Sequence, residues 1–209
     1  MIKRLLLLGI ITVIAFLSPL NIRAASSVAG HKIVIDPGHG GSDFGSTACL
    51  SLYEKDANLE IALKLKDLLT TDGALVYMTR EGNETLSNAD RYNFANSVSG
   101  EALVSVHLNG SNNTNKNGTM GLYGKLRKDK AFTDTVHKKL ASELEVPDLG
   151  ITNYASGVLL KANMPATIQE TVYISNTLEC QLLSDGTGQR QQEIARSLHY
   201  GLVDWFSLK

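Results

Sequence analysis

The sequence predicts a single α/β domain in which helices flank a mostly parallel central sheet. Short apolar runs of strand length alternate along the chain with segments whose apolar residues recur at helical spacing. Strands that alternate with helices in this way are typical of parallel sheets. The length of 209 residues suits one domain, or one domain with a short appendage.

The first three predicted elements lie between residues 32 and 79. Lys32–Asp36 contains a run of branched apolar residues, which predicts a strand buried on both faces. Asp56–Thr70 carries leucine and alanine at helical spacing, and Gly73 follows at a position typical of a helix end. Leu75–Thr79 is a second apolar run and predicts the next strand.

A helix and two strands are predicted next. Ser87 followed by Asp90 resembles a helix cap, and the helix is expected from Asn88 to Ser97. The apolar runs Ala102–Leu108 and Thr119–Tyr123 predict the third and fourth strands.

Two helices and one strand complete the predicted domain. Apolar residues recur every four positions on one face of the first helix, at Phe132, Val136, Leu140 and Leu144. Thr167–Ile174 predicts another strand, and Gln189–Phe206 predicts a closing helix with one apolar stripe.

Residues 1–24 have the three-part pattern of a secretory signal peptide, with an uncleaved N-terminal anchor as the alternative. A basic start is followed by the apolar run Leu5–Leu17, by Pro19 and by the small residue Ala24. The run is short for a membrane span, which needs roughly 20 apolar residues. We therefore expect the domain of residues 25–209 to lie outside the cytoplasmic membrane, either secreted or periplasmic.

The charge balance argues against one class of protein, and the two cysteines leave a disulfide open. Residues 1–24 hold three of the 20 Lys and Arg and none of the 21 Asp and Glu, so residues 25–209 carry 17 − 21 = −4. This acidic balance argues against a nucleic-acid-binding protein. Cys49 and Cys180 are the two cysteines, and sequence alone does not place them in contact.

Three candidate metal ligands stand at the ends of predicted strands and helices. His39 lies among glycines just after the first strand, Glu54 precedes the first helix, and His107 ends the third strand. In α/β folds the functional site lies at the carboxyl ends of the strands. Two imidazoles and one carboxylate leave zinc an open position for water. A structural role for each histidine taken alone is the alternative.

Glu170 is the candidate general acid/base. Strand alternation places it on the same face as Ile168 and Val172, and burial would raise the pKa of its carboxyl group. The alternative is a strand-end glutamate that faces solvent. Glu179 is a weaker candidate because it lies past the expected end of the strand.

The three remaining histidines carry no partner pattern. His31 starts the domain, His137 lies beside two lysines, and His199 follows Leu198 in the last helix. We expect His31 and His137 on the surface, and His199 on the surface or at the end of its helix.

Further motifs accompany the candidate residues in a fixed order across residues 32–206. They are Ile35–Gly41 with Asp43 and Gly45, Glu54–Asp56 with Asn58 and Leu59, Ile61 and Ala62, Thr79 and Arg80, Leu86 with Arg91, Ala95 and Asn96, Ser105–Asn109, Pro165 and Ala166 with Glu170, Ile174–Asn176, and Ile194 with Ala195. In this order they resemble the motifs of the zinc-dependent N-acetylmuramoyl-L-alanine amidases of the third amidase family, a group of cell-wall hydrolases.

The resemblance implies an amidase domain at residues 25–209 with an amidase/phosphorylase-hydrolase-like fold. It implies that His39, Glu54 and His107 hold zinc and that Glu170 is the catalytic acid/base. The implied reaction is hydrolysis of the amide between N-acetylmuramic acid and L-alanine in peptidoglycan. 

Three residues in the matching motifs are candidate substrate-binding residues: Asn109, Arg80 and Arg91. For the two arginines, an ion pair with Asp90 or Glu81 is the alternative.

Two other functions remain open. The chain departs from the family pattern around Glu170, where it carries Gln169, Val172 and Tyr173. These departures suggest a peptidoglycan-binding module with little turnover. Another zinc hydrolase, a peptidase or a deacetylase acting on cell-wall material, is the second alternative. We expect a monomer, and the sequence does not identify any protein activator.

Overall fold

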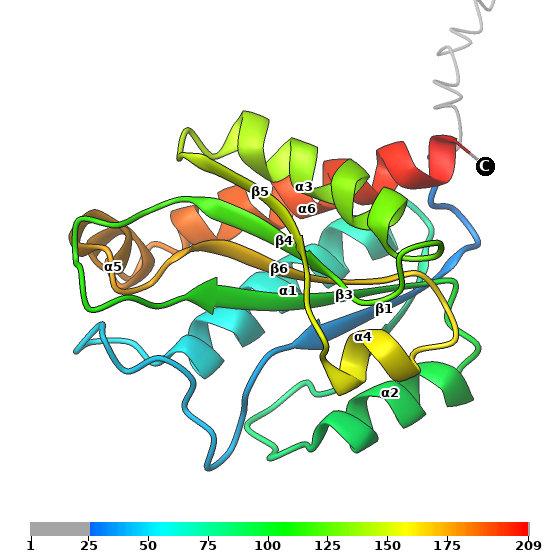
Figure 1. Ribbon diagram of the computed structural model, residues 1–209, viewed down its shortest axis with the longest axis horizontal. Helices are drawn as coiled ribbons and strands as arrows, with labels where there is room; N and C mark the ends of the chain where they lie inside the picture. Colours follow the sequence, from blue (N-terminus) through cyan, green and yellow to red (C-terminus); the bar gives the residue numbers. More distant parts are fainter. Residues whose placement is uncertain (1–25, 209) are drawn as a thin grey trace, which may run out of the picture.

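Six strands form one sheet in the computed structural model, which describes residues 26–208 (Figure 1). The strands are β1 (Lys32–Pro37), β2 (Leu75–Met78), β3 (Ala102–Asn109), β4 (Thr119–Tyr123), β5 (Asp148–Asn153) and β6 (Ala166–Tyr173). The helices are α1 (Glu54–Thr71), α2 (Asn88–Ser97), α3 (Lys130–Glu143), α4 (Gly157–Lys161), α5 (Thr177–Leu183) and α6 (Gln189–Ser207). The predicted signal peptide or anchor at residues 1–24 lies outside the described residues.

The sheet is mostly parallel, as predicted. Its strand order is β2-β1-β3-β6-β4-β5. The first four strands in this order run parallel, whereas β4 pairs antiparallel with β6 and parallel with β5. The carboxyl ends of β1, β3 and β6 therefore meet at one edge of the sheet.

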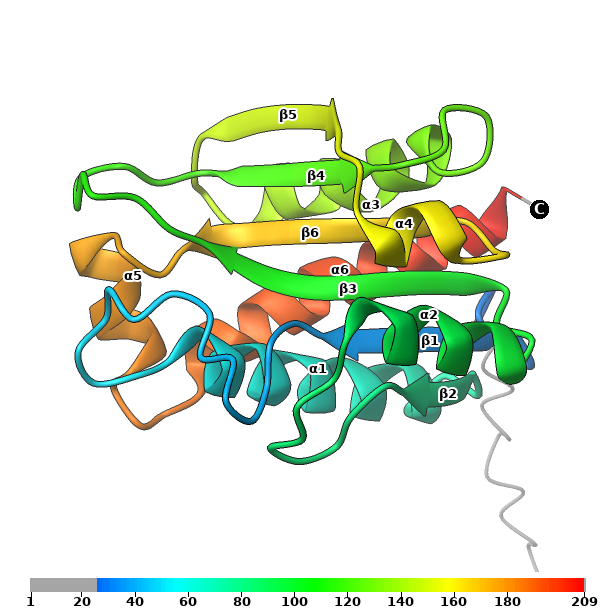
Figure 2. The same cartoon turned by 60° about the horizontal axis from the view of Figure 1, so that its bottom comes forward.

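Helices cover both faces of the sheet (Figures 1 and 2). One face packs against α1, α3 and α6, and the other packs against α2 and α4. Side chains of β1 alternate between the two layers, since Ile33 and Ile35 join the first cluster and Val34 joins the second. The strand is thus buried on both faces, as its unbroken apolar run predicts.

Three elements escape the sequence analysis: β5, α4 and α5. The edge strand β5 has no apolar run, and four of its six residues are exposed. The helices α4 and α5 have five and seven residues, too few to show a helical period. The predicted start of α1 at Asp56 is also two residues late, because α1 begins at Glu54.

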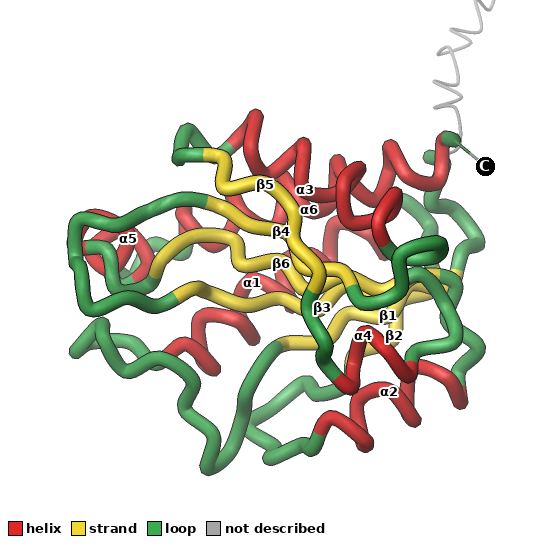
Figure 3. Tube along the Cα trace, viewed as in Figure 1, coloured by secondary structure: helices red, strands yellow, loops and turns green. Residues whose placement is uncertain are grey.

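Loops gather at the carboxyl ends of the parallel strands (Figure 3). The segments that follow β1 and β3 leave the sheet at the same end, and α5 lies at that end too (Figures 1 and 2). The fold therefore brings segments that are distant in the sequence to one edge of the sheet.

No helix within residues 26–208 is both long and apolar enough to span a membrane.

The expected surface position of His137 is wrong: it is 3% exposed and lies 2.7 Å from Asp148. The α3 face that carries His137 packs on β4, whose Gly121 lies directly beneath it.

Candidate metal centre and catalytic glutamate

His39 leaves the end of β1 in a left-handed backbone conformation, with φ of 61°. This conformation is uncommon for a residue other than glycine. Arg91 Nη2 donates to the carbonyl of His39, and Arg80 Nη2 donates to the carbonyl of Gly38. The two arginines thus fix the backbone of this turn by hydrogen bonds to its carbonyl groups.

Glycine at position 38 leaves room for the second imidazole. A Cβ atom at Gly38 would lie 2.3 Å from Cε1 of His107. A side chain at position 38 would therefore collide with His107, another candidate ligand.

Arg80 and Arg91 are both buried, with exposed fractions of 3% and 5%. Arg80 donates to four backbone carbonyls, those of Pro37, Gly38, Lys55 and Gly82. Arg91 forms its ion pair with Asp36, at 2.8 Å, in place of the expected Asp90. In the structure, both arginines bind other parts of the protein. Their contact with substrate stays a prediction.

Asp36 is the charged partner beneath the His39 turn. It is 1% exposed and accepts hydrogen bonds from Thr79, Ser105 and Arg91. Burial alone would raise the pKa of its carboxyl group. The charge of Arg91 and the three hydrogen bonds outweigh burial and hold the pKa below its usual value.

Glu54 is the first residue of α1, and its carboxylate joins the two histidines. Oε1 lies 3.1 Å from Nε2 of His39 and 3.3 Å from Nδ1 of His107. The other oxygen, Oε2, accepts from the backbone N–H of Ser46 at 2.8 Å. Burial opposes ionisation, but the two imidazoles lower the pKa of Glu54 well below its usual range.

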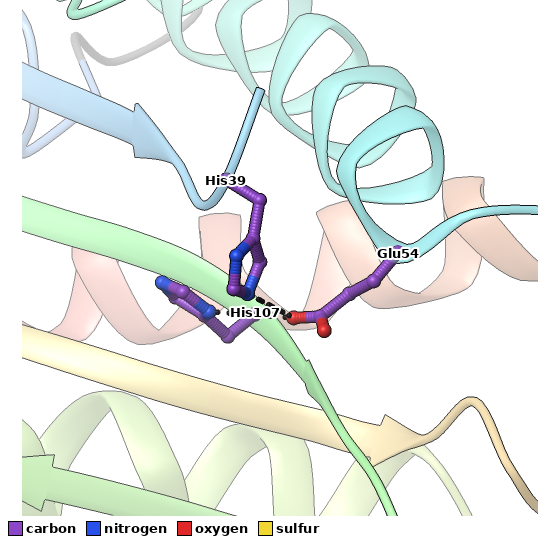
Figure 4. Close-up of side chains that lie close together, drawn as sticks. All are labelled: His39, Glu54 and His107. Atoms are coloured by element: carbon purple, nitrogen blue, oxygen red, sulfur yellow. Dashed lines mark ion pairs between the residues drawn. The ribbon is translucent and has the colours of Figure 1, made fainter. Parts of the chain in front are cut away.

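The three side chains converge from three elements (Figure 4). His39 comes from the turn after β1, Glu54 from α1 and His107 from β3. One potential ligand atom from each residue lies within 4.8 Å of the others. The sequence prediction that these residues come together is therefore confirmed.

This donor set fits a zinc ion. Two imidazole nitrogens and one carboxylate oxygen are a ligand set of catalytic zinc sites. The site also favours positive charge: burial disfavours a charged His39, yet Glu54 and Asp43 raise the pKa of its imidazole to about 9. The same negative field would stabilise a bound cation.

Glu170 lies beside His107 on the neighbouring strand. The two residues are register partners in β3 and β6. Glu170 as a whole is half-buried. Burial raises its pKa, an effect that the charge of His107 offsets only in part.

The sequence analysis predicts that Glu170 shares one face of its strand with Ile168 and Val172. The prediction is right for Ile168 and wrong for Val172. Ile168 belongs to the same layer, but Val172 packs in the opposite one. A register shift between His107 and Asn109 places Asn109 opposite Tyr173. Such an irregularity reverses the alternation of the strand and is common beside functional sites.

A cleft of about 580 Å³ opens above these residues. His39, Glu54, His107 and Glu170 all line it, and so does Asn109. Residues that the sequence analysis missed complete its wall: Asn88, Met120, Thr152, Tyr154 and Ser156. Several of them come from β5 and from the segment before α4, which show no periodic signal.

Glu179 is remote from this cleft. Its carboxylate pairs with Arg190 at 2.7 Å and accepts from Asn117 at 3.0 Å. The structure thus gives Glu179 a buried structural ion pair.

Comparison with known proteins gives a consistent result. A family model described as N-acetylmuramoyl-L-alanine amidase matches residues 33–202. The amidase LytC of Bacillus subtilis is 30% identical over 86% of this chain and 36% of its own length. The probable cell wall amidase LytH of Staphylococcus epidermidis is 33% identical over 90% of this chain and 64% of its own length. The chain therefore spans about one third to two thirds of these relatives.

A solved structure matches more completely. The crystal structure of an N-acetylmuramoyl-L-alanine amidase from Clostridium difficile 630 superposes with a TM-score of 0.79 and 33% identity. The match covers 86% of this chain and 98% of that one. The likeness thus extends over the whole of that enzyme's fold.

Proposed function

The chain belongs to the N-acetylmuramoyl-L-alanine amidase family, and we propose that it hydrolyses the amide bond between N-acetylmuramic acid and L-alanine in peptidoglycan. The observation that carries this proposal is the placement of Glu170 beside the His39–Glu54–His107 cluster, in one cleft. A cleft of about 580 Å³ has room for a sugar with part of its stem peptide.

We propose that His39, Glu54 and His107 hold zinc. When bound, zinc polarises a substrate carbonyl and lowers the pKa of bound water toward neutrality. The residues themselves keep the ligand atoms in place: Asn58, Leu108 and Ser46 donate to Glu54, and Asp43 faces Nδ1 of His39.

Glu170 performs the proton transfers in this proposal. Its raised pKa suits a group that must both accept and donate a proton near neutral pH. Its carboxylate accepts a proton as water attacks the amide carbonyl. The same proton then passes to the nitrogen of L-alanine as the C–N bond breaks, which leaves Glu170 ionised again.

Asn109 is the proposed substrate-binding residue at the cleft. It ends β3 two residues after His107, and its Oδ1 accepts from the N–H of Gly110. The amide nitrogen of its side chain forms no hydrogen bond within residues 26–208. It is therefore available to a sugar or peptide oxygen.

We also propose that the protein acts outside the cytoplasmic membrane, at the cell wall, as the names of its relatives suggest for those proteins. The monomeric state stays a prediction.

The test uses the full chain, loaded with zinc, on purified peptidoglycan. Mass spectrometry of the soluble products should find stem peptides that begin with an unblocked L-alanine. Glu170→Gln should abolish them, since it keeps the side-chain volume and removes the titrating group. Glu143→Gln is the matched control, because Glu143 is exposed at the end of α3 and should behave as wild type.

Other products would select the alternatives. Cleavage between stem residues would indicate a peptidase, and release of acetate would indicate a deacetylase. A zinc-loaded chain that binds peptidoglycan and releases nothing would be a binding module.

A further inference from the structure

A disulfide joins Cys49 to Cys180, which lie 131 residues apart in the sequence. Cys49 belongs to the segment between the His39 turn and α1, and Cys180 belongs to α5. We propose that this disulfide is a positioning element of the metal centre, so that zinc affinity depends on whether the two cysteines are oxidised. This inference rests on the proposed zinc site.

The segment around Cys49 touches the metal centre through Ser46. The N–H of Ser46 donates to Oε2 of Glu54, and the carbonyl of Ser46 accepts from the N–H of Glu54. Because Oε2 is held at 2.8 Å by Ser46, the other carboxylate oxygen is directed at the two imidazoles. Leu108 and Asn58 donate to Oε1, so a displaced Ser46 would leave Oε2 without its donor and hold the carboxylate through one oxygen only.

Gly45, the residue before Ser46, packs against two of the ligands. A Cβ atom there would lie 2.6 Å from Oε2 of Glu54 and 2.6 Å from Cδ2 of His39. The backbone at residues 45 and 46 is therefore in contact with the metal centre, and a movement of this segment is transmitted to it.

The segment has few other anchors. Among the described residues, the hydrogen bonds of residues 47–52 stay within residues 46–52, apart from the contacts of Cys49 itself. Leu50 is fully exposed, and Leu52 packs against the core only in part. Cys49, 1% exposed, is the one buried residue between positions 46 and 53.

The other end of the disulfide is firmly held. Thr177 of α5 donates its backbone N–H to Thr114, and Asn176 caps the helix. Glu179, adjacent to Cys180, is 2% exposed and bound by Arg190 and Asn117. The disulfide thus ties a loosely anchored segment to a fixed helix, and Figure 2 shows both at the carboxyl end of the sheet.

Groups that orient metal ligands from behind commonly change metal affinity by about 10–100-fold when they are removed. The double variant Cys49→Ser/Cys180→Ser of the full chain should therefore bind zinc about 10–100-fold more weakly. Zinc affinity is measured by competition with a chromogenic chelator. Hydrogen exchange at the Ser46 amide, measured without zinc, should become faster in the double variant.

The wild-type chain can be reduced without a competing zinc ligand by a trialkylphosphine. The phosphine is oxidised to its phosphine oxide with oxygen from water, and the disulfide gains two electrons and two protons to give two thiols. The reduced wild type should match the double variant in exchange at Ser46.

A general loss of stability is the competing explanation. Leu202→Ala serves as the control, because Leu202 is a fully buried residue of α6 in the core. It should lower the melting temperature and leave the zinc dissociation constant unchanged in the folded protein.

Three outcomes would overturn the proposal. They are a folded double variant that binds zinc within twofold of wild type, a Leu202→Ala variant that loses zinc affinity equally, and an oxidised wild type that binds no zinc. No substrate is used, so a chain that fails to cleave peptidoglycan leaves this test intact.

Discussion

The Nδ1 atom of His39 lies 2.9 Å from Oδ2 of Asp43, four residues further along the chain. The imidazole therefore donates its Nδ1 hydrogen to a carboxylate while Nε2 faces Glu54 at 3.1 Å. This contact would keep the remaining hydrogen on Nδ1 when Nε2 gives its lone pair to a metal ion. Asp43 is itself oriented, because its Oδ1 accepts from the N–H of Gly45.

Asp43→Asn should weaken zinc binding by about 10–100-fold, the usual effect of losing a carboxylate behind a ligating histidine. The amide keeps the acceptor for Gly45 but removes the negative charge beside the imidazole. Chelator competition measures the dissociation constant, and circular dichroism checks the fold. An Asp43→Asn variant with wild-type zinc affinity would show that Glu54 alone orients His39.

Gly45→Ala should disrupt the metal centre more than its backbone strain explains. Gly45 has φ of 65°, and an added Cβ would meet Glu54 and His39 at 2.6 Å. Gly186→Ala is the matched control, because Gly186 has φ of 77° and nothing within 4 Å of its Cβ position. Both variants carry a similar left-handed strain of about 1–2 kcal/mol. Only Gly45→Ala should lose zinc affinity, and equal losses in both variants would refute the packing explanation.

Removal of metal should destabilise the folded protein and stop hydrolysis. At a free zinc concentration 100 times the dissociation constant, binding stabilises the folded state by about 2.7 kcal/mol. A chelator should therefore lower the melting temperature of the wild type, and added zinc should restore it. His107→Ala removes one ligand, so its melting temperature should respond little to either addition. A wild type that melts identically with and without chelator would argue against a resident metal.

Asp36 should contribute stability that disappears in acid. The pKa of this carboxyl group is lowered from its ordinary value of 3.8 in the folded protein. Its contribution is therefore complete above that value and is lost as pH falls below it. At pH 7, Asp36→Asn should lower the free energy of unfolding by about 3–5 kcal/mol, because Arg91 stays buried without its charged partner.

Urea unfolding between pH 7 and pH 3 measures this effect. The gap between wild type and Asp36→Asn should narrow as pH falls below 3.8. Asp67→Asn, an exposed substitution on α1, should follow the wild type at every pH. A gap that stays constant across this range would mean that the charge of Asp36 is not the stabilising property.

Sequence was sufficient for the parts of the fold that repeat a strong pattern. The buried strand β1 shows as an unbroken apolar run, and α6 shows as an apolar stripe of helical period. His39 and His107 each stand near the end of a buried strand. Because parallel strands end at one edge, the two histidines had to meet there. The pairing of Cys49 with Cys180 had no such signal, since two cysteines far apart in a chain carry no information on distance.

The far wall of the cleft was not predictable for a different reason. The residues of β5 are mostly exposed, and its backbone turns left-handed at Gly150. Its position depends on pairing with β4, which itself pairs with β6 in the antiparallel direction. Sequence patterns report burial and period, and neither reveals which exposed residues end up facing a site.

Tyr154 is the residue of this wall whose role can be measured most directly. It follows β5, its N–H donates to the carbonyl of Tyr123, and the residue is 53% exposed while lining the cleft. An exposed aromatic ring at a cleft offers a large contact surface to a sugar or peptide at little entropic cost. Tyr154→Ala should therefore raise KM for peptidoglycan fragments about tenfold with kcat nearly unchanged, the pattern of lost uniform binding.

Tyr154→Phe separates the ring from its hydroxyl group and should keep most of the wild-type KM. Tyr200→Ala on α6 is the control, because Tyr200 is 39% exposed and does not line the cleft. Steady-state kinetics on soluble muropeptides give both constants for each variant. If Tyr154→Ala lowered kcat and left KM unchanged, the ring would act on the geometry of the reacting groups. In that case the β5 wall would belong to the catalytic site and would not be a surface that only holds the substrate.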